Sequence, residues 1–136
     1  MRARRVGSWL RRLAAAPAGE PPAQAARRIA QEQGRDLGTS ERAGSRAARG
    51  QPLAAAGRTL QRLGYAPTRD GERLTLANCP FHAIVQVVPE VTCAVNLALI
   101  EGLLTGLDLD KQLTAHLQPR ADACCVTLAG ATAEGA

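Results

Sequence analysis

The apolar residues between positions 53 and 128 switch repeatedly between helical and strand spacing, and this pattern limits the possible folds most. Two stripes recur every three or four residues, as on one face of a helix: Leu53, Ala56, Leu60 and Leu63, then Cys93, Leu97, Ile100 and Leu104. Two segments alternate with a period of two, as in strands: Leu74 and Leu76, then Cys124, Val126 and Leu128. The order helix, strand, helix, strand predicts mixed α and β structure.

Turn-forming residues separate these segments. Gly64 can end the first helix, and Asp70-Gly71 is a strong tight-turn signal that predicts a hairpin. Pro89 suits the first turn of the second long helix, and Gly106 suits its end. We therefore predict an α+β fold in which helices pack on one face of an antiparallel sheet.

A further short helix is predicted after Gly106, because Asp108 can cap a helix that runs through His116. On such an amphipathic helix, His116 is predicted to be a surface or half-buried side chain and not a metal ligand. The last strand, from Cys124 to Leu128, is followed by a tail that is predicted to fray from Gly130.

The N-terminal part has weaker periodicity. We predict a basic helix from Arg2 to Ala16, a linker from Pro17 to Pro22 and a second helix from about Ala23 to Gln33 with a weak apolar stripe. The stretch from Gly34 to Pro52 is predicted to be a loop or a poorly ordered helix. The predicted divisions are 1–22 (basic helix and linker), 23–52 (connecting helix and loop), 53–128 (α+β domain) and 129–136 (disordered tail).

Charge is distributed unevenly. Residues 1–62 carry thirteen Arg and four acidic residues, and residues 63–136 carry four basic and eight acidic residues, so the halves are +9 and −4 and sum to +5. The basic half can attract phosphates, acidic lipid or an acidic partner, and solvated helix faces explain it equally well. One short basic helix without a second reading element supports only weak, nonspecific contact with DNA.

The first residues resemble the charged start of a signal peptide, but Arg11 and Arg12 interrupt a short apolar run and prolines follow. Neither an export signal nor a membrane span is predicted. We expect a cytoplasmic protein whose four cysteines are reduced thiols or metal ligands.

All four cysteines and both histidines lie between positions 79 and 125. Cys79 follows the predicted hairpin, and His82 comes three residues later. Cys93 opens a helix, whose N-terminal dipole favours the thiolate that metals bind. A metal site can form where these ends meet the last strand.

Only one residue of the pair Cys124 and Cys125 is expected to face such a site, because adjacent strand residues point to opposite faces; we favour Cys124. Two alternatives stay open. Free cysteines are often buried and only pack. Cys79 can act as a nucleophile with His82 as its base, but no oxyanion site is evident, so we do not predict an enzyme.

Several motifs together resemble the C-terminal half of ArsR-like winged-helix transcriptional regulators. The resemblance covers residues 53–128, a little over half the chain. Its motifs are Leu63-Gly64-Tyr65-Ala66-Pro67, Asn78-Cys79-Pro80-Phe81-His82, Pro89 with Cys93, Asn96 to Leu104, and Cys124-Cys125-Val126. The chain is more distantly similar to SufR repressors of iron–sulfur cluster assembly.

This resemblance implies a sensor domain that takes part in transcription regulation. It nominates Cys79, Cys93 and Cys124 as ligands of an iron–sulfur cluster with His82 as the fourth, and zinc is the alternative metal. It also implies a homodimer or pairing with a full-length regulator, with DNA bound only indirectly or weakly. Residues 1–52 are too short and too interrupted by Gly and Pro for a complete winged-helix module, so we expect either a fragment of a transcriptional regulator or a stand-alone sensor domain.

Overall fold

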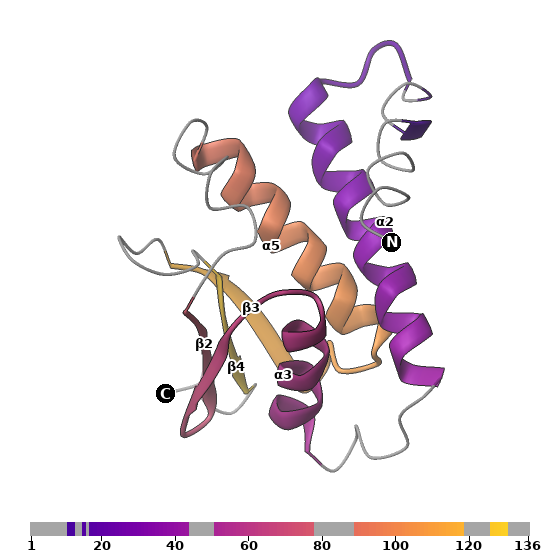
Figure 1. Cartoon of the computed structure of the whole chain (residues 1–136). Helices are drawn as coiled ribbons and strands as arrows, with labels where there is room; N and C mark the ends of the chain where they lie inside the picture. Colours follow the sequence, from indigo (N-terminus) through magenta and orange to yellow (C-terminus); the bar gives the residue numbers. More distant parts are fainter. Residues whose placement is uncertain are drawn as a thin grey trace.

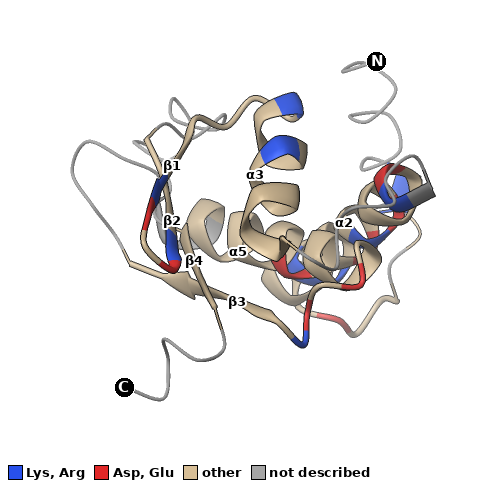
Figure 2. Ribbon diagram, turned by 90° about the horizontal axis from the view of Figure 1, so that it is seen from below, with Lys and Arg blue, Asp and Glu red and all other residues tan. Residues whose placement is uncertain are grey.

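The computed structural model describes residues 11–12, 15, 17–43, 51–77, 89–118 and 126–130. Its elements, in chain order, are α2 (Pro22–Ala43), α3 (Pro52–Arg62), β1 (Pro67–Asp70), β2 (Arg73–Leu76), α5 (Pro89–Gly106), β3 (Leu113–Leu117) and β4 (Val126–Gly130). The strands form one antiparallel sheet in the order β1-β2-β4-β3. Helices α3 and α5 pack on one face of this sheet, and α2 lies beyond α5 (Figures 1 and 2). The predicted α+β fold is confirmed.

The core lies between the sheet and the two helices above it. Leu74 pairs with Leu128 across β2 and β4, and both side chains are at most 3% exposed. They join a cluster with apolar residues of the helices, which include Leu53, Ala56 and Leu60 of α3 and Ile100, Leu103 and Leu104 of α5. The helical stripes and the strand alternation of the sequence therefore meet in one core.

The turn signals act as predicted around α3 and the hairpin. Pro52 stands in the first turn of α3, and the helix ends at Leu63, before Gly64 with a φ of 105°. Only a residue without a Cβ adopts this left-handed conformation at little cost. Gly71, with a φ of 62°, lies in the turn between β1 and β2. The bounds of α5 are also those that Pro89 and Gly106 predict.

Helix α2 is longer than predicted: of the two alternatives for the stretch after Gly34, a loop or a poorly ordered helix, the structure has a helix up to Ala43. Gly34 and Gly38 lie inside the helix, on the face that meets α5. A Cβ at Gly34 would lie 2.0 Å from the carbonyl oxygen of Leu99, and one at Gly38 would lie 2.3 Å from that of Leu103. These glycines, which look like helix breakers, let the two backbones touch.

Helix α5 has a matching pair of glycines. A Cβ at Gly102 would lie 2.1 Å from the carbonyl oxygen of Gln31, and one at Gly106 would lie 2.2 Å from that of Arg35. The contacts advance along both helices in the same direction, so α2 and α5 run parallel with their backbones in contact (Figure 1). Ile29 and Ala30 of α2 are fully buried as well. The contact with α5 therefore stabilises a helix that its own apolar stripe predicts only weakly.

The predicted short helix through His116 is wrong, because residues 113–117 form β3 and pair with β4 along its whole length. Asp108 does not cap a new helix. It adopts a φ of 62° and closes α5, where the Leu109 N–H donates to the Leu104 carbonyl. The segment also alternates with a period of two, and pairing with β4 decides in favour of the strand.

The chain ends of the structure agree with the sequence only in part. The predicted helix from Arg2 to Ala16 lies largely outside the described residues, as does most of the tail. Strand β4 continues to Gly130, which is buried and donates its N–H to the Glu72 carbonyl at 3.0 Å. Fraying therefore does not begin at Gly130, and the division into domains stays a prediction.

Candidate metal centre

The elements that lead to the predicted ligands end together at one end of the sheet. Thr75 of β2 pairs with Thr127 of β4, so Leu76 at the end of β2 lies next to Val126 at the start of β4. Leu117, the end of β3, also pairs with Val126. The start of α5 lies over this same end (Figure 1, upper left).

Cys93 is the one predicted ligand among the described residues. It is the fifth residue of α5, is 8% exposed and forms no disulfide. Its side chain belongs to the same buried cluster as Leu76 and Val126. Cys93 is therefore a buried thiol near the start of α5, the helix that begins over the end of the sheet where β2 stops and β4 starts (Figure 1).

The chain positions of the other predicted ligands follow from these ends. Cys79 comes three residues after Leu76, and Cys124 comes two residues before Val126. Cys79, His82, Cys124 and Cys125 themselves lie outside the described residues. Within the described ranges, no group of three or more His, Cys, Asp and Glu side chains could hold a metal ion. The ligand set therefore stays a prediction.

A buried polar pair ties α5 to the hairpin at this end. The Tyr65 hydroxyl donates a hydrogen bond to the side-chain oxygen of Asn96, and the two residues are 4% and 0% exposed. Asn96 lies one turn after Cys93 on α5. The Ala77 N–H donates to the Ala66 carbonyl at 2.8 Å, which places Tyr65 beside the end of β2. The pair holds the start of α5 against the base of the hairpin.

The sequence patterns described above do not predict that Tyr65 and Asn96 form a pair. The available signal was Asn96 itself, an amide between Cys93 and Ile100 near the apolar stripe of α5. A buried amide needs hydrogen-bond partners, and the one tyrosine of the chain is an obvious source of a long, partly apolar donor. The sequence thus indicates Tyr65 as a candidate donor, but it carries no signal that the two residues lie close together in the fold.

Comparisons with protein-family models, with curated proteins and with solved structures gave no match for this chain. The resemblance to ArsR-like regulators therefore rests on the residues quoted above.

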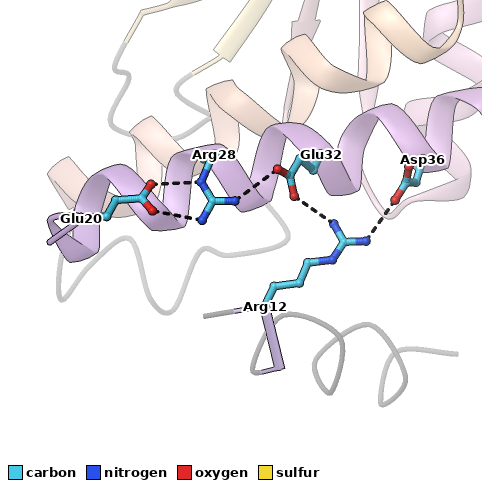
Figure 3. A network of polar contacts seen from close by, with 5 residues as sticks. All are labelled: Arg12, Glu20, Arg28, Glu32 and Asp36. Atoms are coloured by element: carbon cyan, nitrogen blue, oxygen red, sulfur yellow. Dashed lines mark hydrogen bonds and ion pairs between the residues drawn. The ribbon is translucent and has the colours of Figure 1, made fainter. Parts of the chain in front are cut away.

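The largest polar network of the described residues lies elsewhere, on the outer surface of α2 (Figure 3). Arg28 donates to Glu20 at 3.0 Å and to Glu32 at 3.2 Å, and Arg12 bridges Glu32 and Asp36. Hydrogen bonding to Glu20 is the main cause that raises the pKa of Arg28 above its ordinary value. Exposed pairs of this kind contribute little to stability and are weakened by salt.

This network bears on the predicted basic surface. Along α2, blue and red residues alternate and do not form a continuous basic stripe (Figure 2). Three carboxylates pair with the two arginines of the network: Asp36 with Arg12, Glu20 with Arg28, and Glu32 with both. The described part of α2 therefore gives no stronger support for nucleic-acid binding than the sequence did. Among the described residues of the chain, no helix has the length and apolarity that a membrane span requires.

Proposed function

We propose that this chain is a sensor domain of bacterial transcription regulation that holds an iron–sulfur cluster at the end of the sheet described above. Cys79, Cys93 and Cys124 are the proposed thiolate ligands, and His82 is the proposed fourth ligand. The domain acts as a homodimer or with a full-length regulator, and any contact with DNA is weak or made through that partner. The proposed setting is the cytoplasm.

One observation carries this proposal: α5, with Cys93 as its fifth residue, begins over the end of the sheet where β2 stops at Leu76 and β4 starts at Val126 (Figure 1). The two chain segments that contain Cys79 and Cys124 leave from these residues, three and two positions away. Cys79 and Cys124 are therefore close in the chain to the end of the sheet over which α5 begins, and they are the cysteines proposed to complete the site with Cys93.

The donor set suits the metals considered. Three thiols and one imidazole match the ligands of iron–sulfur clusters and of zinc. Bound iron–sulfur would supply a group whose charge and integrity depend on oxidants, and its binding energy would add to the folding energy of this end of the domain. Zinc without sulfide is the second candidate, with the same ligands.

A non-metal interaction domain is the alternative in a different class. The burial of Cys93 in an apolar cluster is the observation in its favour, because a free cysteine packs well as a small apolar residue. In that case Cys93→Ala would lower the stability of the fold through lost packing and would leave metal content unchanged.

We expect protein that is expressed and purified without oxygen to contain iron and acid-labile sulfide and to absorb broadly in the visible range. The measurement is iron, zinc and sulfide per chain, with a visible spectrum. Cys79→Ser, Cys93→Ser and Cys124→Ser should each lose most of the iron and the visible band, because each removes a thiolate.

Cys125→Ser is the matched control, since it makes the same change one residue from Cys124 and should keep the metal. Far-UV circular dichroism of each variant separates loss of metal from loss of fold. Zinc without sulfide, lost in the same three variants, would support the zinc centre. Wild-type protein free of metal, or equal metal in all four variants, would refute the metal centre and leave the interaction domain.

A further inference from the structure

The two edges of the sheet differ in how they are protected. Edge strand β1 contains Pro67, Arg69 and Asp70, and its last three residues are exposed. Proline and charges of this kind block pairing with another strand. Edge strand β3 has the sequence Leu-Thr-Ala-His-Leu, with no proline and no Asp, Glu, Lys or Arg. Its outer edge has no strand partner among the described residues, so it is the edge open to pairing.

The hydrogen-bond ladder shows which groups of β3 point outward. The Gly130 N–H donates to Glu72 of the hairpin, so Gly130 and Leu128 direct their backbone groups toward β2. Thr127 and Ala129 then face β3, where they pair with His116 and Thr114. By this alternation, the N–H and C=O groups of Ala115 and Leu117 point away from the sheet.

The sequence around this edge is nearly the same in both directions. Residues 112–118 are Gln-Leu-Thr-Ala-His-Leu-Gln, centred on Ala115. An identical strand placed antiparallel about that centre sets Gln112 against Gln118, Leu113 against Leu117 and Thr114 against His116. Every apolar residue meets an apolar one and every polar residue meets a polar one, as an interface of two identical surfaces requires.

We propose that β3 pairs with β3 of a second copy of this chain, antiparallel and centred on Ala115, so that the two four-stranded sheets join into one. The Ala115 N–H donates to the Ala115 carbonyl of the second copy, and the Leu117 N–H donates to the Leu113 carbonyl, each twice by symmetry. The Leu113 N–H takes no part, because it donates to Leu109 within the chain.

Side-chain burial also favours this partner. Leu117 is 44% exposed, and it is the one exposed large hydrophobic side chain among the described residues. In the joined sheet it lies against Leu113 of the second copy, which is on the face that the helices cover. The pairing thus removes apolar surface from water and puts no charged side chains opposite each other at its centre.

This inference names the surface of the homodimer in the proposed function, but it rests on β3 and not on the metal centre. A twofold axis through Ala115 reverses the strand direction between the copies. It therefore places the two proposed metal centres at opposite ends of the joined sheet, where neither copy adds a ligand to the other.

Sedimentation equilibrium of the full chain tests the pairing. The wild type should have twice the monomer mass at about 100 µM, well above the roughly 10 µM dissociation constant of a small edge-to-edge interface. Leu117→Lys should raise that constant by about tenfold or more, because it brings a charge into the paired edge. Thr68→Lys adds the same charge to the exposed β1 edge and should leave the dimer unchanged.

Ala115→Pro is a second, backbone test, since its N–H points outward and proline removes no bond to β4. The Ala115→Pro variant should be monomeric. If it does not fold, the result with Leu117→Lys alone tests the pairing. A monomeric wild type, or a dimer unaffected by Leu117→Lys, would overturn the proposal. Iron content is measured on the wild type and does not depend on this pairing, because each proposed metal centre lies within one copy; failure of this interface is therefore distinguishable from failure of the metal centre.

Discussion

Gly102→Ala is expected to destabilise the protein by about 2–3 kcal/mol and to lower its melting temperature by roughly 10 °C. The new Cβ would lie 2.1 Å from the backbone carbonyl oxygen of Gln31, and a backbone atom cannot rotate away as a side chain can. The helices α2 and α5 would have to separate, which outweighs the roughly 1 kcal/mol that alanine gains as a helix former. Thermal unfolding followed by far-UV circular dichroism measures the effect.

Gly57→Ala is the matched control for this prediction. Gly57 is also buried in a helix, but its nearest neighbours to a new Cβ are Leu74 side-chain carbons at 3.7 and 3.8 Å, which is ordinary contact. This variant should be as stable as the wild type or more stable by about 0.5–1 kcal/mol. Equal melting temperatures for Gly102→Ala and Gly57→Ala would show that α2 does not pack on α5 in solution as described.

Tyr65→Phe and Asn96→Leu are each expected to cost about 2 kcal/mol, because each leaves the other residue without the hydrogen bond that joins them in the core. The double variant should lose less unfolding free energy than the two single variants together, by about 1 kcal/mol or more. The hydrogen bond is already broken by either single change, so the second change does not break it again. Urea unfolding of the four proteins gives this coupling energy. Strict additivity would contradict a direct interaction between Tyr65 and Asn96.

Local signals in the sequence predict much of this fold. Gly64 follows the end of α3, Asp70-Gly71 lies at the hairpin turn, and α5 begins at Pro89 and ends at Gly106. These residues act through their own backbone geometry, so their effect does not depend on distant parts of the chain.

The elements that the sequence predicts wrongly or only weakly depend on contacts with distant residues. Glycines such as Gly34 and Gly38 normally weaken a helix, and these two are helical here because they pack directly on the backbone of α5. The segment that contains β3 has helical spacing from Leu109 to Leu117 as well as strand alternation. It forms a strand because it pairs with β4, which comes later in the chain and lies outside these local signals. The candidate site has the same limit: chain order predicts that Cys93 lies near the ends of β2 and β4, but it does not identify Tyr65 as the partner of Asn96.

X-ray absorption at the iron or zinc edge of the protein purified without oxygen tests the central claim most directly. We expect the nearest shell around the metal to be mainly sulfur at about 2.3 Å, with a lighter scatterer in agreement with one imidazole. A nearest shell of oxygen and nitrogen alone would contradict a centre built on Cys79, Cys93 and Cys124.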